Sequence, residues 1–229
     1  MKPLSLRLAT PVQLLVLIGG GEFSFGETRA IDELLLSRMP PDRRTIAFLP
    51  TASGSVEYAT HIGKYFKSID PTVDTVNVPI YRGRDSRRQR NLEQILSAGM
   101  IYLGGGVTNN LLETLRESPA ELALRDAAAK GAVVVAIGAA ASSFGTWTRD
   151  MTRAGGALPG LGWLEATTID TAFRAEEDVA LRRLMSLPEV ELGLGIPAGT
   201  ALAINGGGTA DIIGDGTVAV FRKTANTLH

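Results

Sequence analysis

Cysteine is missing from the 229 residues of this chain, and histidine occurs only twice. The lack of cysteine excludes disulfides, thiolate metal sites and cysteine nucleophiles. One of the two histidines, His229, is the last residue, which leaves His61 as the practical histidine base for an activated nucleophile. Because zinc prefers nitrogen and sulfur ligands, we expect no metal site, and we expect no cofactor.

Long hydrophobic runs and a strong net charge are missing as well. The apolar residues 14–18 are too few to span a membrane, and they lead into Gly19-Gly20-Gly21-Glu22 without a signal-peptide cleavage site. A net charge of −1 provides no field that would recruit nucleic acid or an anionic membrane. We therefore interpret residues 14–18 as a buried first strand, and expect a cytoplasmic protein that binds neither nucleic acid nor membranes.

Short apolar runs alternate with amphipathic stretches through the first two thirds of the chain. The apolar runs, which read as strands buried on both faces, are 14–18, 45–49, 73–78, 100–103 and 133–137. The amphipathic stretches, which predict helices, are 27–38, 56–69, 92–96, 109–116 and 120–130. This alternation is typical of a mostly parallel sheet covered on both faces, a three-layer α/β/α sandwich.

The rhythm changes after about residue 150, where the glycines and prolines of 155–160 predict a long loop. We expect a strand over 166–173 and a helix over 176–185. Short strands separated by glycines then follow at 192–196, 200–204, 210–213 and 218–221, with Asn205-Gly206 and Asp215-Gly216 as hairpin signals. We interpret this end as an antiparallel extension of the same sheet, and residues 1–229 as one domain.

Two glycine turns follow predicted strands, and the carboxyl ends of strands are where such sheets bind ligands. Gly20, Gly21 and Glu22 belong to the first turn and are candidate crevice residues, although Glu22 serves equally well as a carboxylate at a helix start. In the second turn, the amides of Gly104, Gly105 and Gly106 could hold an anion or oxyanion, but a plain strand-to-helix turn explains them too. Neither a P-loop nor a dinucleotide fingerprint fits the second turn.

Three polar residues after the second turn have two interpretations. Thr108, Asn109 and Asn110 either contact a ligand or cap the following helix. Capping is favoured for Thr108, and Asn109 stays open.

Residues 138–143, Gly-Ala-Ala-Ala-Ser-Ser, follow the strand at 133–137 and lead into a short helix. A strand that ends in small residues before a helix is typical of a nucleophile elbow, which lifts one side chain on a sharp turn. Here the elbow holds only a methyl group.

Six segments, in order, resemble peptidase family S51, the dipeptidase E and cyanophycinase group. They are Ile18-Gly19-Gly20-Gly21-Glu22, Leu49-Pro50-Thr51-Ala52-Ser53, 103–111, 133–142, Asp170-Thr171-Ala172-Phe173 and 195–202. The resemblance covers nearly the whole chain. It implies a fold like that of class I glutamine amidotransferases, with serine-peptidase relatives that release Asp-containing dipeptides or degrade cyanophycin. It also implies that the glycines of 104–106 and the amide of Ala140 form an oxyanion site.

The departures from this family pattern are all at the positions where the family has its catalytic or active-site residues. The nucleophilic serine aligns with Ala139, or with Gly138 or Ala140 if the register slides by one, and none of these has a hydroxyl. The catalytic histidine aligns with Ala172, and an Asp-Glu pair with Pro197-Ala198. Loss of both nucleophile and base removes the covalent route. Because neighbouring residues also differ from the family pattern, we interpret the missing serine and histidine as a natural loss and not as engineered substitutions.

Four hydroxyl residues and one histidine are candidates to replace the missing nucleophile and base. Ser142 and Ser143 lie just past the elbow, where hydroxyls usually bond to backbone carbonyls inside a helix. Thr51 and Ser53, on a second crevice loop, are weaker nucleophile candidates, and His61 is expected to be a surface or partly buried residue of a helix. The arginines at 82, 84, 87, 88 and 90 read as a solvated loop or, alternatively, as a site for an acidic partner.

The sequence therefore predicts an S51 peptidase homologue without peptidase activity. We expect its surviving crevice to bind a small peptide, an amino acid or a protein partner, and we allow for a homodimer. The competing hypothesis is an active hydrolase that uses Ser142 or Ser143 as a relocated nucleophile.

Overall fold

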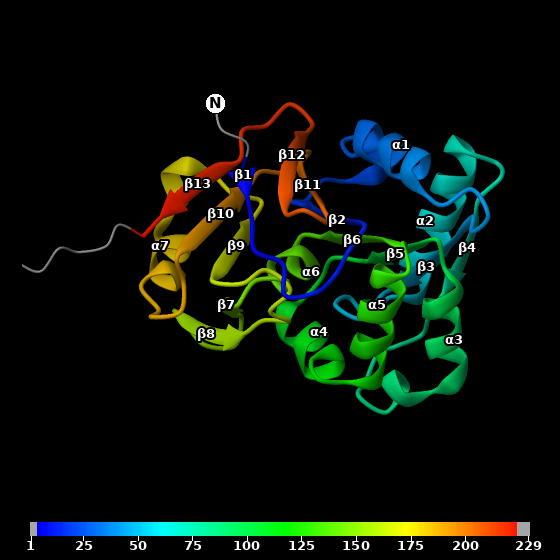
Figure 1. Ribbon diagram of the computed structural model, residues 1–229, viewed down its shortest axis with the longest axis horizontal. Helices are drawn as coiled ribbons and strands as arrows, with labels where there is room; N and C mark the ends of the chain where they lie inside the picture. Colours follow the sequence, from blue (N-terminus) through cyan, green and yellow to red (C-terminus); the bar gives the residue numbers. More distant parts are fainter. Residues whose placement is uncertain (1–3, 224–229) are drawn as a thin grey trace, which may run out of the picture.

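The computed structural model describes residues 4–223, which form two β-sheets with helices packed around them (Figure 1). The larger sheet has eight strands in the order β1-β12-β11-β2-β6-β5-β3-β4, and the smaller has five in the order β13-β10-β9-β7-β8. Within these residues, none of the helices has the length and apolar character required to cross a membrane.

The larger sheet confirms the predicted parallel core. Strands β2 (Leu14–Ile18), β6 (Val133–Ile137), β5 (Met100–Leu103), β3 (Thr45–Leu49) and β4 (Asp74–Asn77) all run parallel. Strands β11 (Ala201–Asn205) and β12 (Thr209–Ile213) then add an antiparallel extension next to β2, and β1 (Leu4–Ser5) pairs with β12. The carboxyl ends of β2, β6 and β5 therefore meet at one edge.

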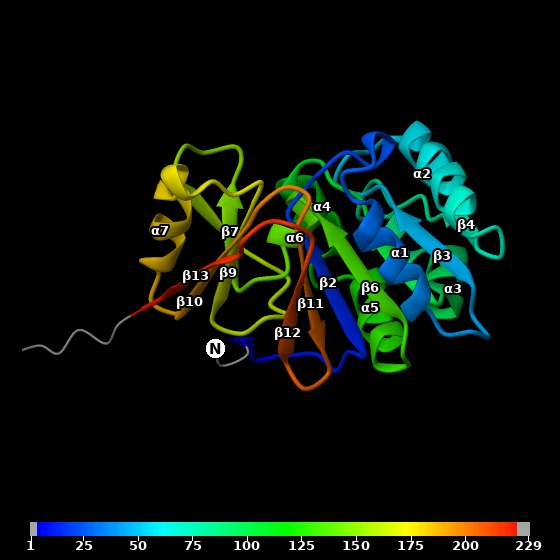
Figure 2. The same ribbon diagram turned by 90° about the horizontal axis from the view of Figure 1, so that it is seen from above.

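Alternate residues of the central strands enter opposite cores, as expected for a sheet covered on both faces. Val16 and Ile18 pack with α1 (Arg29–Arg38) and α2 (Val56–Ile69). Leu15 and Leu17 pack on the other side, where the helices are α3 (Gln89–Ser97), α4 (Thr108–Leu115), α5 (Pro119–Ala129) and α6 (Ala139–Ser142). Figure 2 shows α1 and α2 on one side of the sheet and α3 and α5 behind it. The three-layer α/β/α class is thus confirmed.

The second sheet was not predicted. Strands β9 (Thr167–Thr171) and β10 (Leu192–Ile196) pair in parallel, and β13 (Ala219–Arg222) pairs with β10. The expected loop after residue 150 instead contains a hairpin of β7 (Trp147–Asp150) and β8 (Gly156–Pro159). Of the predicted terminal strands, only β11 and β12 extend the main sheet. The pattern of apolar residues in a strand indicates which side chains are buried, but it does not indicate which sheet the strand joins.

Helix α7 (Val179–Met185) covers the second sheet and is shorter than the predicted 176–185, which begins with the 3-10 turn η3 (Ala175–Glu177). It packs against β10 and β9, on the left in Figure 1. Gly193 allows this close approach, since a β carbon there would lie 2.6 Å from the sulfur of Met185.

A buried carboxylate, Asp32, lies between α1 and α2 beside the turn η1 (Phe23–Phe25). Its Oδ2 atom accepts hydrogen bonds from Thr28 Oγ1 and from Tyr65 OH, both at 2.8 Å. Its Oδ1 atom has no partner within residues 4–223. Burial therefore raises the pKa of Asp32 to about 6, against the lowering effect of the two hydroxyl hydrogen bonds.

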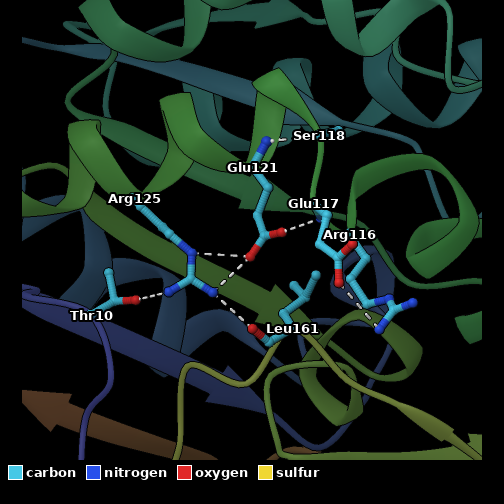
Figure 3. A network of polar contacts seen from close by, with 7 residues as sticks. All are labelled: Thr10, Arg116, Glu117, Ser118, Glu121, Arg125 and Leu161. Carbon is cyan, nitrogen blue, oxygen red and sulfur yellow. Dashed lines mark hydrogen bonds and ion pairs between the residues drawn. The ribbon is translucent and has the colours of Figure 1, made fainter.

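A second polar network joins α5 to two distant segments (Figure 3). Glu121 is buried, and its Oε1 lies 2.7 Å from Arg125 Nη2, while its Oε2 accepts the Glu117 amide at 2.7 Å. Arg125 also donates to Thr10 Oγ1 and to the carbonyl of Leu161, and its guanidinium lies 5.2 Å from the centre of the Trp163 ring. One side chain thus ties the segment before β2 and the segment before β9 to α5.

The Asp32 carboxyl makes stability depend on pH in a defined direction. Its pKa is raised in the folded state, so the folded protein retains this proton over a range where the unfolded chain has lost it. Its contribution falls as pH rises from about 4 to about 6, by about 3 kcal/mol, and is flat above. Asp32→Asn lacks this term. Urea unfolding should show that, relative to the natural protein, the free energy of unfolding of Asp32→Asn is higher at about pH 7 than at about pH 4. The same change of unfolding free energy with pH in both proteins would contradict this role of Asp32.

Arg125→Met should lower the free energy of unfolding by about 3 kcal/mol, because it leaves the Glu121 carboxylate buried without a counter-ion. The matched variant Glu121→Gln/Arg125→Met should lose less, since a glutamine still accepts the Glu117 amide and carries no charge. Urea titration of both variants checks this. A double variant less stable than Arg125→Met would overturn the account.

Candidate functional site

The carboxyl ends of strands from both sheets meet at the first glycine turn. The amide of Gly138, after β6, donates to the carbonyl of Ile18 at 2.9 Å. The amide of Ala172, after β9, donates to the next carbonyl, Gly19, at 2.6 Å. The amide of Gly199 donates to Gly20 at 2.9 Å. The expected serine and histidine positions are therefore joined through two consecutive residues of one turn.

The sharp turn of the elbow is at Gly138, where φ is 58° and ψ is −122°. A β carbon built there meets no atom within 4 Å, so a side chain at this position would project into open space. Ala139, the first choice for the serine position, is instead the first residue of α6. The elbow geometry thus moves the apex one residue earlier, to an alternative that the sequence had left open, because glycine tolerates positive φ.

The histidine position also has unusual backbone. Ala172 is exposed and has a φ of 49°, a region that histidine, asparagine and aspartate enter more readily than alanine does. Pro197 and Ala198 lie in the short connection between β10 and β11. Ala198 Cβ lies 4.0 Å from a β carbon built on Gly20. These three positions therefore surround the first glycine turn, as the alignment implied.

The second glycine turn lies beside the elbow. A β carbon on Gly105 would lie 3.4 Å from the carbonyl oxygen of Ile137, the residue before the apex. Gly104 is buried, whereas Gly106 is exposed. With the apex at Gly138, the following amide belongs to Ala139 and not to Ala140, which is completely buried in α6. Ala139, and not Ala140 as expected, is therefore the residue whose amide follows the apex.

Ser142 and Ser143 direct their hydroxyls into the helix. Both Oγ atoms donate to the carbonyl of Ala139 at 2.9 Å. Ser143 is completely buried, and Ser142 also lies near the hydroxyls of Thr108 and Thr148, at 3.5 and 3.4 Å. Within residues 4–223, neither hydroxyl hydrogen-bonds to a histidine, carboxylate or lysine. This is the arrangement of helix serines that bond to their own backbone.

The side chain of Asn109 makes two hydrogen bonds inside the protein. Its Nδ2 donates to Asp150 Oδ1 at 2.9 Å, and its Oδ1 accepts the Met151 amide at 2.9 Å. Hydrogen bonds from Thr152 and Asn109 lower the pKa of Asp150 to about 2. Asn109 therefore orders the turn after β7, which favours a structural role over contact with a ligand. The capping interpretation of Thr108 is wrong, because Val107 is the N-cap of α4 and Thr108 is its first helical residue, with Oγ1 3.5 Å from Ser142 Oγ. Asn110 Nδ2 donates to Ala52 O at 3.4 Å.

Of the remaining predicted residues, Glu22 and Ser53 are held by local hydrogen bonds, whereas the buried Thr51 Oγ1 has no partner within residues 4–223. Glu22 caps η1 by accepting from the Ser24 amide and hydroxyl, at 3.3 and 2.9 Å, which favours its role at a helix start. Thr51 is buried, and Ser53 Oγ donates to Pro50 O at 3.3 Å. His61 is exposed on α2, as expected.

A cavity of about 140 Å³ adjoins Ala139 and is bounded by polar groups of α4, α6, β7 and β9. Asp170 lies on its wall and is 9% exposed, with Arg149 Nη1 4.0 Å away. Burial raises the pKa of Asp170, while the Arg149 charge opposes this rise. In the sequence, Asp170 stands out only as part of the segment Asp170-Thr171-Ala172-Phe173. Its place at the carboxyl end of a strand was the signal that could have identified it.

A larger cavity, about 590 Å³, continues from the same residues of β7. It shares Arg149 and Met151 with the first cavity and extends between the β7–β8 turn and α7. Within residues 4–223, no three histidine, aspartate or glutamate side chains converge as metal ligands do. The expectation of no metal and no cofactor stays a prediction.

Comparison with known proteins assigns the family. The model of peptidase family S51 matches residues 15–212, so the chain belongs to this family. The uncharacterized peptidase YgaJ of Bacillus subtilis is 30% identical over 130 residues. That match covers 56% of this chain and 54% of YgaJ, so it spans about half of the relative's length.

Two solved structures share the fold. A crystal structure of a peptidase from an acI-B1 Actinobacterium superposes with a TM-score of 0.78 at 20% identity, over 93% of this chain and 92% of that one. A putative peptidase E from Listeria monocytogenes superposes with a TM-score of 0.57 at 15% identity, over 93% and 100% of the two chains. At these identities the likeness concerns the fold.

The two turn glycines should respond differently to substitution. A β carbon on Gly106, where φ is 149°, would lie 2.4 Å from the backbone of Ala52, so Gly106→Ala should cost about 3 kcal/mol or more from strain and overlap together. Gly138→Ala has backbone strain alone and should cost about 1–2 kcal/mol. Thermal and urea unfolding of both variants measures the difference, and equal losses would show that the space above Gly138 is filled.

Proposed function

We propose that this S51 family member has no peptidase activity and that its crevice binds a small peptide or amino acid. The observation that carries the proposal is the elbow itself: its apex, Gly138, has the positive-φ backbone of a nucleophile position but no side chain. A cytoplasmic location and a homodimer stay predictions from the sequence.

The lack of a reactive group extends to the surroundings of the apex. The expected base position is Ala172, and the nearby Ser142 and Ser143 hydroxyls are bonded to the Ala139 carbonyl. Covalent catalysis requires a nucleophile with a base within hydrogen-bond reach. Within residues 4–223, neither Ser142 nor Ser143 has such a base, and the apex has no side chain, so no observation favours the alternative of a relocated serine nucleophile.

The cavity next to the apex supports a small cationic or zwitterionic ligand. Asp170 contributes a mostly buried carboxylate whose nearest cation, on Arg149, is 4.0 Å away. An ammonium group would stabilise the charged form of this carboxylate. The cavity of about 140 Å³ suits the amino-terminal end of a peptide or one amino acid, and the adjoining larger cavity offers room for a following residue.

The test combines turnover with binding. Asp-Leu, Asp-Arg and Ala-Leu dipeptides should show no hydrolysis above the rate without protein, while a bound dipeptide raises the melting temperature by mass action. Gly138→Phe should abolish that increase because its side chain fills the open space above the turn. Gly138→Ala, which imposes the same backbone strain, should retain it.

Two results would count against the proposal. Hydrolysis of a dipeptide that disappears in Ser142→Ala or Ser143→Ala would establish the relocated nucleophile. No melting shift with any amino acid or dipeptide, or equal shifts in the Gly138→Phe and Gly138→Ala variants, would remove the crevice as the binding site.

A further inference from the structure

An arginine-rich turn connects the edge strand β4 to α3, outside the crevice residues discussed so far. Within nine residues it carries five arginines, all exposed: Arg82, Arg84, Arg87, Arg88 and Arg90. We call this set the arginine turn. The chain as a whole has a net charge of −1, so this local concentration of one sign is not a consequence of composition.

The arginine turn is built on a buried polar core. Asp85, only 5% exposed, accepts the amides of Tyr81 and Arg82 at 3.2 Å each. Asn91, also buried, donates its Nδ2 to the Asp85 carbonyl at 3.0 Å. Ser86 Oγ donates to the Gly83 carbonyl at 2.6 Å. These bonds fix the backbone, so the guanidinium groups project from an ordered surface.

Most of the positive charge of the arginine turn is unpaired. Arg88 lies 3.0 Å from Asp85 and Arg84 lies 4.0 Å from the same carboxylate. Within residues 4–223, no carboxylate lies within 4.0 Å of Arg82, Arg87 or Arg90. One buried carboxylate thus pairs with two of the five guanidinium groups.

The position of these charges is unfavourable for the fold. Arg88 and Arg90 stand at the amino-terminal end of α3, whose first turn contains no acidic residue. The helix dipole favours negative charge at that end and disfavours cations. Arg88 is offset by its ion pair with Asp85, whereas Arg90 has no carboxylate within 4.0 Å among residues 4–223. A residue that breaks such a local rule without a compensating contact is typical of a surface that serves a function.

We propose that the arginine turn is a docking surface for an acidic segment of a protein partner. Guanidinium groups bind carboxylates in bidentate pairs, and an ordered array reduces the entropy lost on binding. Residues 82–90 contain no aromatic side chain on which nucleic-acid bases could stack. This favours a polypeptide over single-stranded nucleic acid. The proposal does not depend on the function of the crevice.

The test uses a fluorescein-labelled peptide of alternating glutamate and glycine, with fluorescence anisotropy at low and at physiological salt. The natural protein should bind the peptide, and added salt should weaken binding as it screens exposed charges. Arg82→Glu/Arg87→Glu/Arg90→Glu should weaken it by about tenfold or more. The matched control Arg38→Glu/Lys64→Glu/Arg222→Glu, with the same change in net charge at exposed positions elsewhere, should alter it less than about threefold.

Three outcomes would overturn the proposal. One is the absence of binding to the natural protein at low salt. Another is equal weakening in both triple variants, which would mean a response to net charge alone. The third is tighter binding of a single-stranded oligonucleotide of equal charge, which would make the surface a nucleic-acid site. Circular dichroism and melting temperatures of both triple variants verify that they are folded.

Discussion

Two consecutive carbonyls of the first glycine turn organise this molecule. Ile18 accepts the amide that follows β6, and Gly19 accepts the amide that follows β9. The first bond belongs to the parallel sheet, and the second joins that sheet to the smaller one. Unpaired backbone groups are costly when buried, so these bonds fix the relative position of the two strand ends. The crevice exists because both sheets end at the same turn.

The parallel core could be predicted because its strands are short, apolar and separated by amphipathic helices. Residues 14–18, 45–49 and 133–137 have the predicted bounds, and the helix over 56–69 does as well. The second sheet could not be predicted. Residues 147–150 and 156–159 pair across a glycine-rich turn that resembled a loop, and nothing in residues 192–196 indicates whether β9 or β2 is the neighbour.

The candidate site, like the fold, could be predicted only in part. The sequence placed the two glycine turns, the elbow and the alanine at the histidine position, because motif order gives chain positions directly. It did not settle the apex, since three small residues in a row fit three registers; backbone angles place it at Gly138. It also missed the contacts of Asn109 and Asp170, which depend on residues more than twenty positions away.

The short connection between β10 and β11 constrains how anything enters the crevice. Residues 197–200 pass from the smaller sheet to the larger one, and Gly199 is bonded to Gly20 within that passage. A hinge between the sheets would have to break this bond and the Ala172–Gly19 bond together. For the small ligand proposed above, entry and exit would therefore require motions of side chains and loops around this fixed backbone. Substitutions that change the affinity for that ligand should lie at the edge of the crevice.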